Sequence, residues 1–298
     1  KLGRPQEAEE LFRRALAVYR QLAEHDPKTA VYHLRQGQGY TELLRVLWSR
    51  GRDDEAARLM EDAVDTLSNT AREHGNVPAA RDSLARFHHD LANLQRQRAQ
   101  NDDALKNYTQ AAAIWGKLAD DVPGEPAYRG HQGYVLTYSL PSLLVATGRH
   151  AEARAHWQRA LETLPKSAEA HNNLAWLLAT CPDETLRDPR RAVELASKAV
   201  ELEPAQGTYR NTLGVAHYRA GDWPAAIEAL NKSMERRQRG DAFDWFFLAM
   251  AEWQRGNKDE ARKWYDKAVD WAEKNARDNE ELKRFSAEAT ALLGVKDE

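Results

Sequence analysis

The sequence has a single cysteine, Cys181, among 298 residues, so the chain cannot form an internal disulfide framework or a site built from several thiolates. Glycine and proline number only 16 and 11, too few for the turns of a sandwich of many short strands. Neither sign of charge dominates, since 43 Lys and Arg stand against 46 Asp and Glu. This balance gives no general attraction to phosphates, and we expect no nucleic acid partner.

A long apolar run is also lacking. The longest stretch without Asp, Glu, Lys or Arg covers 19 residues from Gly130 to Gly148, but it contains His131, Gln132 and Pro141. We interpret this stretch as a buried amphipathic helix and expect no membrane insertion. The chain begins abruptly in polar helix-forming sequence without a signal peptide, so we expect an excised fragment of a cytoplasmic protein.

A pattern of small and bulky residues recurs seven times. In most copies a bulky residue follows a small one by four positions, and a second small residue follows three positions later. Offsets of four and three place these side chains on one helical face, where small residues let a neighbouring helix approach closely. The copies are Ala8-Phe12-Ala15, Ala56-Met60-Ala63, Ala104-Tyr108-Ala111, Ala153-Trp157-Ala160, Ala192-Ala196-Ala199, Ala226-Leu230-Ser233 and Ala261-Tyr265-Ala268.

Turn signals precede most copies. A glycine stands five residues before the first small residue in five of them, at Gly3, Gly51, Gly148, Gly221 and Gly256. Glycine fits the left-handed conformation that ends a helix, so each glycine predicts a corner between two helices. The third copy has Ala99 at this position and the fifth has Arg187. The aspartates that follow are predicted helix N-caps: Asp53, Asp102, Asp188 and Asp222.

These positions resemble the tetratricopeptide repeat (TPR), and the resemblance covers essentially the whole chain. It implies an all-α fold, a right-handed superhelix (α-solenoid) of antiparallel helix pairs. The first three steps between copies are 48, 48 and 49 residues, whereas the last two are 34 and 35. The extra length is about two turns in each helix of a long pair. We therefore expect one solenoid over 1–298, with long-helix repeats in 1–165, standard-length repeats in 166–275, and a capping helix and tail in 276–298.

The sequence is predicted to be helical nearly throughout. First helices of the pairs are expected near 30–50, 79–99, 127–147, 168–180, 207–220 and 242–255. Second helices are expected near 5–25, 53–74, 102–120, 150–164, 189–202, 223–236 and 258–275, and a capping helix over 279–293. Pro141 should kink the helix 127–147, because proline removes a backbone hydrogen bond. The segment from Thr180 to Pro189 lengthens a turn and should bulge at the surface.

No constellation of residues indicates catalysis. Gly37-Gln38-Gly39 is half of a phosphate-loop fingerprint, without a preceding strand or a third glycine. His88 and His89 are adjacent, so they point in different directions on a helix and do not form a metal-ligand pair. Cys181 has no neighbouring base in the sequence and is expected to be a free thiol. We expect no enzyme activity, no metal and no cofactor.

In the TPR family the first helices line a concave groove that binds an extended peptide or a partner helix. When the family's register is applied to this chain, the groove positions include Arg86, Val135 and Phe243. Each lies three residues before another groove position, namely His89, Tyr138 and Phe246 in turn. The candidate groove residues are Arg45, His89, Asn93, Arg96, Tyr138, Asn172, Trp176, Asn211, Tyr218, Phe246 and Trp253.

The chemistry of these candidates changes along the chain. Arg45, Arg96 and His89 suit carboxylates or phosphates, and the amides of Asn172 and Asn211 can pair with a peptide backbone. The carboxy-terminal positions are aromatic and apolar and suit an apolar anchor, but the alternative that Phe243, Phe246 and Trp253 pack against the capping helix or a neighbouring chain stays open. The lysines that carboxylate-clamp TPRs use for chaperone tails are absent here.

The later repeats also resemble the carboxy-terminal TPR regions of large bacterial Ser/Thr protein kinases. The segments that carry this likeness are 172–183, 211–223 and 244–250. The chain has no His-Arg-Asp or Asp-Phe-Gly triplet, so we expect no phosphotransfer by the fragment itself. The leading hypothesis is a non-catalytic module that binds a protein or peptide. The alternatives are a self-associating scaffold and a regulatory appendage of a multidomain kinase.

Overall fold

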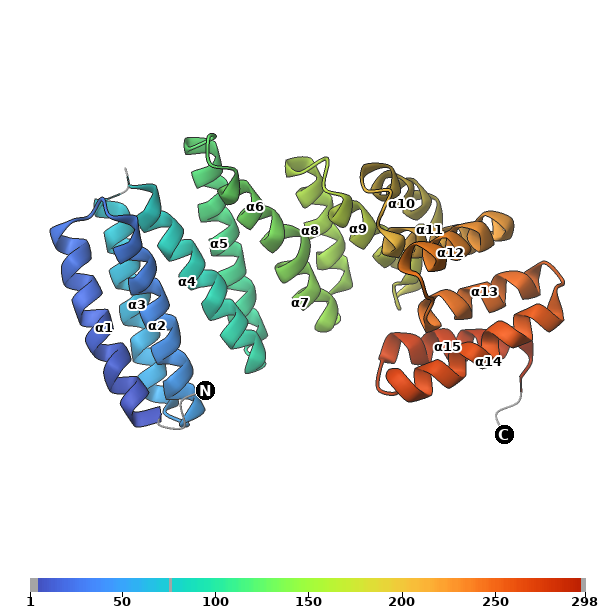
Figure 1. The fold of residues 1–298 in the computed structure, drawn as a ribbon, viewed down its shortest axis with the longest axis horizontal. Coiled ribbons are helices and arrows are strands. Elements are labelled where there is room, and N and C mark those ends of the chain that lie inside the picture. The colour runs from blue at the N-terminus through green and yellow to red at the C-terminus, as the bar shows by residue number, and fades with distance from the viewer. Residues whose placement is uncertain (1–4, 75–76, 296–298) are drawn as a thin grey trace. The chain divides into compact units, whose positions relative to one another are not determined.

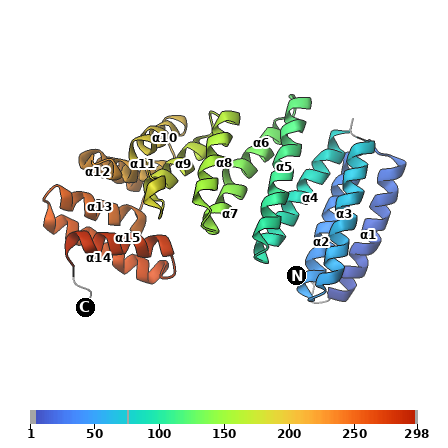
Figure 2. The ribbon, with the colours of Figure 1, turned by 180° about the vertical axis from the view of Figure 1, so that it is seen from behind.

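The computed structural model describes residues 5–74 and 77–295, and all regular structure in these ranges is helical (Figures 1 and 2). The prediction of an all-α array of antiparallel helix pairs is confirmed. The helices are α1 (Pro5–His25), α2 (Ala30–Ser49), α3 (Asp53–Glu73), α4 (Pro78–Gln97), α5 (Asn101–Asp121), α6 (Pro126–Tyr134), α7 (Leu140–Ala146), α8 (His150–Thr163), α9 (Ala168–Thr180), α10 (Pro189–Leu202), α11 (Gly207–Arg219), α12 (Trp223–Arg237), α13 (Ala242–Gln254), α14 (Lys258–Asn275) and α15 (Glu280–Leu293).

The repeated small residues form the contact faces of the helices. From the second copy onward the first and last small residues are fully buried or nearly so, as for Ala56, Ala63 and Ser233. In α1, by contrast, Ala8 and Ala15 are only half-buried. No described helix packs against this side of α1.

The glycine corners take the predicted conformation. Gly51, Gly148, Gly221 and Gly256 all have positive φ values, between 67° and 86°. Ala99, which replaces glycine in the third copy, adopts the same left-handed conformation with φ 59°. Gly3 lies outside the described residues.

Two of the four predicted N-caps are confirmed. The side chains of Asp188 and Asp222 accept hydrogen bonds from the backbone N–H groups of Arg191 and Ala225, as N-caps do. Asp53 and Asp102 are not caps, because α3 begins at Asp53 itself and α5 at Asn101, which makes Arg52 and Gln100 the N-cap residues. Both aspartates lie within the first turn, where a negative charge still stabilises the helix dipole.

The chain divides into two compact units between Gly148 and Arg149, called here the N-terminal and C-terminal units. The core of the N-terminal unit includes Tyr40, Leu44 and Phe87, all essentially without exposure. In the C-terminal unit α13 is buried nearly all round, and Phe246 and Phe247 have no exposed surface. None of the described helices combines the length and the apolar character needed to cross a bilayer.

Pro141 interrupts its helix through a π-helical segment, Val135–Ser139, which lies between α6 and α7. The backbone N–H of Leu140 donates to the carbonyl of Val135, five residues earlier, instead of four. Proline has no N–H to donate, which leaves the preceding turn free to widen. The helix predicted over 127–147 is therefore divided into α6, one wide π-helical turn and α7.

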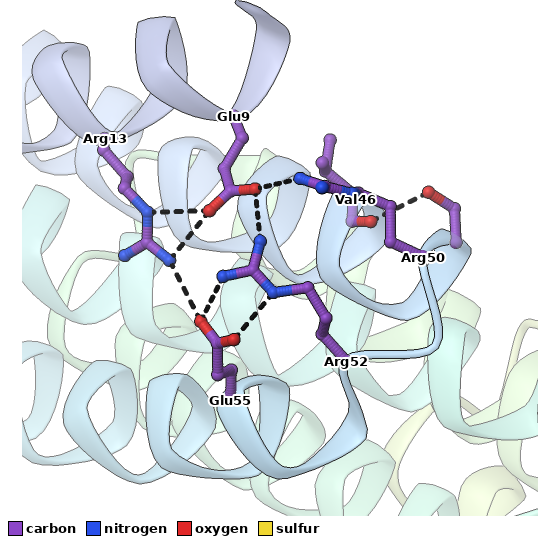
Figure 3. Close-up of polar contacts among 7 residues, drawn as sticks. Glu9, Arg13, Val46, Arg50, Arg52 and Glu55 are labelled. Atoms are coloured by element: carbon purple, nitrogen blue, oxygen red, sulfur yellow. Dashed lines mark hydrogen bonds and ion pairs between the residues drawn. The ribbon is translucent and has the colours of Figure 1, made fainter. Parts of the chain in front are cut away.

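An ion cluster holds α1 against the following pair (Figure 3). Glu9 of α1 is 8% exposed and accepts hydrogen bonds from Arg50 and Arg52, each at 2.6 Å, and from Arg13 at 3.1 Å. Arg52 also donates to Glu55 at 2.7 Å. Burial alone would raise the pKa of the Glu9 carboxyl, but the hydrogen bonds from Arg13 and Arg52 hold it below its usual value.

The turn from Thr180 to Pro189, predicted to bulge at the surface, is exposed only in part. Residues 182–185 are exposed and contain a short 3₁₀ turn, Glu184–Leu186. Cys181 itself is buried, and its backbone carbonyl accepts a hydrogen bond from Arg187 at 2.7 Å. Burial raises the pKa of the Cys181 thiol, which makes it less reactive than an exposed cysteine.

Candidate functional site

In the N-terminal unit a cluster of aromatic rings is centred on His89 of α4 and includes rings from α5, α6 and the π-helical segment. The imidazole of His89 lies 5.6 Å from the ring of Tyr108, 6.0 Å from that of Trp115 and 6.1 Å from that of Tyr134, centre to centre. Tyr134 in turn lies 5.4 Å from Tyr138. Tyr108 and Trp115 come from the second helix α5, so the cluster joins α4, α5 and α6. The side of the first helices α2, α4 and α6 that lies at this cluster is called here the N-terminal first-helix face.

A buried carboxylate orients the polar members of this face. Asp82 accepts hydrogen bonds from Trp115 Nε1 and from Arg86 Nε, both at 2.8 Å. A second nitrogen of Arg86 lies 3.0 Å from His131 Nε2. A guanidinium can only donate, so this nitrogen of His131 is the acceptor and the imidazole is neutral. Burial, and then the charge of Arg86, lower the pKa of His131.

The face is hollowed by a pocket of about 220 Å³, lined by Arg86, His89, Trp115, His131 and Tyr134 among others. Tyr134, which lines the pocket, and its neighbour Tyr138 have 50% and 46% of their surface exposed. The pocket therefore offers neutral imidazole and an arginine at its wall, with two tyrosines half in water at its rim.

The widened turn before Pro141 changes which residues reach this face. A π-helical turn holds one extra residue, so everything before it is displaced by one position relative to an α-helix. The predicted groove residue Val135 is fully buried, and Tyr134 takes its place on the surface. His131, three residues earlier, joins the pocket for the same reason. The prediction for Val135 was wrong because an undisturbed helical register was assumed.

The other predicted residues of this unit lie on or near the face. Asn93 accepts a hydrogen bond from Tyr108 at 2.7 Å, so its side chain is bound within the cluster. Arg45 is exposed on α2 and pairs with Glu42 at 3.4 Å, and Arg96 is exposed near the end of α4. Tyr138, His89 and Asn93 are thus brought together, and Arg96 lies beside Tyr108 of the same cluster.

In the C-terminal unit the first helices are α9, α11 and α13, and their shared surface, the C-terminal first-helix face, is covered by α15. Figures 1 and 2 show α15 running alongside α13. Trp176 of α9 donates from Nε1 to Glu281 of α15 at 3.0 Å. The ring of Phe285 lies 6.1 Å from Trp176, 6.3 Å from Phe243 and 4.9 Å from Phe247. The capping helix therefore lies across the face on which a groove was predicted.

A partly buried ion pair secures the middle of α15. Both terminal nitrogens of Arg219, on α11, donate to the two carboxylate oxygens of Glu288, one of them at 2.6 Å. The Arg219 side chain is only 12% exposed. Such two-point pairs fix orientation as well as distance, so α15 has a defined register on the face.

Comparison with known proteins identifies the repeat. Tetratricopeptide repeat models match residues 1–27, 142–180, 184–242 and 245–275. This chain belongs to the tetratricopeptide repeat family. No curated protein sequence matches it. Among solved structures, BtubC (BKLC) from P. vanneervenii has a TM-score of 0.53 and 18% identity, covering 78% of this chain and 91% of that one.

Other TPR-fold structures align less closely. The pilF protein of Pseudomonas aeruginosa has a TM-score of 0.45 with 16% identity, and covers 85% of this chain and 97% of that one. A thermophilic TPR protein of Thermus thermophilus, TTC0263, has a TM-score of 0.41 with 16% identity, over 70% and 99%. TPR repeats make protein-interaction modules, and that general function applies to this chain.

Within the C-terminal half of the TPR array, the predicted groove residues separate into three groups. Trp176 lies on the face but under α15. Asn211 and Phe246 are core residues. Asn211 donates to the fully buried Asp244 at 2.8 Å, and the Phe246 ring packs 6.3 Å from that of Tyr265 on α14. These two side chains are therefore not accessible to a partner.

The third group of predicted groove residues lies at the edges of the C-terminal first-helix face and consists of Tyr218, Trp253 and Asn172. Tyr218 packs against Phe247 with ring centres 5.5 Å apart, and burial raises its pKa to about 12. Trp253, at the end of α13, has the Lys258 ammonium 4.9 Å from its ring centre. Asn172 donates to Asn173, and its own buried Oδ1 accepts no hydrogen bond from any described residue.

Proposed function

We propose that this TPR array is a non-catalytic module that binds a partner protein through the N-terminal first-helix face, taking an extended segment or a helix. The observation that carries the proposal is the half-exposed pair Tyr134 and Tyr138 beside the His89 pocket. Aromatic side chains held partly in water next to a polar pocket are the side chains that most often anchor protein interfaces.

The charge around the pocket indicates the chemistry of the partner. Arg86 lines the pocket, while Arg45 and Arg96 are exposed about two turns beyond the pocket residues Gln38 and His89 on α2 and α4. Arginine forks recognise carboxylates, and the tyrosine pair can pack against an apolar or proline side chain. We therefore expect a segment that places an acidic residue close to an apolar one.

Self-association is the second candidate function. Leu11 and Val18 are 59% and 52% exposed on α1, seven residues apart and hence on one face of the helix. They lie on the side of α1 that no described helix covers. A second copy packing there would bury both side chains. The likeness to kinase-associated arrays stays a prediction about the parent protein.

Two matched double variants separate these functions. Peptides selected from a random library on the intact chain are tested by fluorescence anisotropy against Tyr134→Ser/Tyr138→Ser and against Leu11→Ser/Val18→Ser. We expect the tyrosine variant to lose at least about tenfold in affinity, since it removes two interface anchors, and the α1 variant to bind normally. Equal binding by the tyrosine variant would refute the proposed face. Concentration-dependent light scattering that disappears in the α1 variant would favour self-association.

A further inference from the structure

We propose that the C-terminal first-helix face is a binding site for a partner helix, and that α15 is a resident ligand which such a helix displaces. The partner helix carries, as α15 does, a carboxylate in its first turn, a phenylalanine four residues later and a second carboxylate three residues after that. This inference goes beyond the proposed function, which concerns the other unit.

Polar side chains of the C-terminal first-helix face contact α15 at defined positions. Trp176 donates to Glu281 at 3.0 Å, and Thr180 on the next turn of α9 donates to the same carboxylate oxygen at 3.4 Å. Arg219 of α11 donates hydrogen bonds to Glu288 from both terminal nitrogens. A helix that only shields an apolar end needs no such donors, whereas a ligand site uses them to select register and direction.

An aromatic anchor lies between the two carboxylates. Phe285 is 1% exposed and meets the edges or faces of three rings, those of Trp176, Phe243 and Phe247. An aromatic side chain filling a pocket between charged contacts is the usual arrangement of an interface hot spot. The face is therefore complementary to the sequence Glu-x-x-x-Phe-x-x-Glu on one side of a helix.

The resident helix also makes unfavourable contacts. Burial lowers the pKa of Arg284 on α15, and the nearby charges of Arg187 and Arg219 lower it further against the opposing effect of Glu281. The Nη1 atom of Arg284 is buried and finds no acceptor among the described residues. An unpaired buried donor costs free energy, so a helix without this arginine should bind the face better than α15 does.

The covalent link between α14 and α15 is short. Only residues 276–279 separate α14, which ends at Asn275, from α15, which begins at Glu280. Such a link gives α15 a high effective concentration, on the order of millimolar, so a free helix competes only when it binds well or when α15 is weakened.

The test uses a fluorescein-labelled peptide of residues 279–294 and the full chain with the charge pair exchanged. In Arg219→Glu the face repels its own Glu288, and a peptide carrying Glu288→Arg restores the pair in the opposite sense. We expect the exchanged peptide to bind this variant at least about tenfold more tightly than the native peptide does, with the reverse preference on the wild-type chain. Arg236→Glu, the same charge change at an exposed site on α12, should not alter the preference.

A second variant does not depend on the charge exchange. Full-length Phe285→Ala weakens the resident helix, so it should bind the native peptide more tightly than the wild-type chain does, and an Arg284→Gln peptide more tightly still. Failure of both the exchange and Phe285→Ala to change peptide affinity, with helicity retained by circular dichroism, would show that α15 is a fixed part of the fold and overturn the proposal. Exchange of α15 between copies, seen as dimers without peptide binding, would overturn it as well.

Discussion

Two first-helix faces of one chain differ in what covers their aromatic side chains. In the N-terminal unit Tyr134 and Tyr138 stand about half in water, whereas in the C-terminal unit Trp176 and Phe243 pack beneath Phe285 of α15. The N-terminal face has a small pocket with Arg86 in its wall. On the other face the arginine is already paired with a carboxylate of the same chain.

The difference shows that repeat register alone does not decide which face is free. Both units present the same surface of their first helices, because the buried pattern of small residues orients every pair alike. Access then depends on whether another segment of the chain docks on that surface. A helix with the matching carboxylates and phenylalanine occupies the C-terminal face, and no described segment within the N-terminal unit does so for Tyr134 and Tyr138.

The largest effect is expected from Phe285→Ala. Removing a buried phenylalanine that meets three other rings should weaken the docking of α15 by about 3 kcal/mol. Hydrogen exchange should then accelerate across α15 while α2 to α5 keep their protection, and Trp176 fluorescence should shift toward that of a solvated indole. Tyr134→Ala, a truncation of similar size on the open face, should leave exchange unchanged. Uniform acceleration in both units would contradict an independently docked helix.

A smaller effect is expected from Glu9→Gln in the other unit. The amide leaves Arg13, Arg50 and Arg52 without a shared anion, and α1 should lose about 1–2 kcal/mol of docking free energy. Hydrogen exchange of α1 measures this loss. Glu10→Gln is the matched control, because Glu10 forms an exposed pair with Arg14 and its removal should have no measurable effect.

The same carboxylate predicts a pH dependence. The folded pKa of Glu9 lies below its ordinary value of 4.5, so its stabilising contribution is complete above pH 4.5 and is lost as the pH falls through the lower folded value. The difference between wild type and Glu9→Gln should therefore shrink in acid. A difference that grows below pH 4.5 would mean that the cluster does not hold α1 electrostatically.

Local patterns in the sequence predicted most of the helices and their corners. Gly51 and Gly221 mark turns because the left-handed conformation they need is costly for other residues, and such constraints act within a few positions. The same holds for Asp188 and Asp222 as caps. Family register then placed His89, Asn93 and Tyr138 on one surface, where the structure has them in contact or close by.

Two features could not be predicted from local patterns. Pro141 indicated an irregular helix, but not that one extra residue in the turn would bury Val135 and bring Tyr134 and His131 to the face. The place of α15 depends on contacts between residues more than 100 positions apart, as for Trp176 and Glu281. Periodicity gave α15 an apolar side but not the surface it covers, and so Trp176 was predicted as an open groove residue.

Acid should also lower the stability of the N-terminal unit through His88, a buried imidazole of its core, with a milder effect than that of the changes above. His88 is largely buried and bonds to Asn107 at 2.7 Å, and burial lowers its pKa below 6.5. Because the unfolded histidine binds a proton first, stability is lost as the pH falls below 6.5, by at most about 1.4 kcal/mol per pH unit. Thermal melts between pH 7.5 and 5.5 should show a flatter dependence for His88→Gln. Identical slopes for both proteins would exclude His88 as the cause.

The smallest effect concerns Ala99, the corner that lacks glycine. Its φ of 59° is the conformation that Gly51 and Gly148 adopt in the neighbouring corners, and a β-carbon destabilises it. Ala99→Gly removes that strain but makes the unfolded chain more flexible, so the net gain should be about 0.5–1 kcal/mol. Gly148→Ala should cost a similar amount, although nothing lies within 4 Å of the added carbon. Urea melts of the two variants should therefore shift in opposite directions, and a loss of stability in Ala99→Gly would mean that side-chain contacts of Ala99 outweigh its backbone strain.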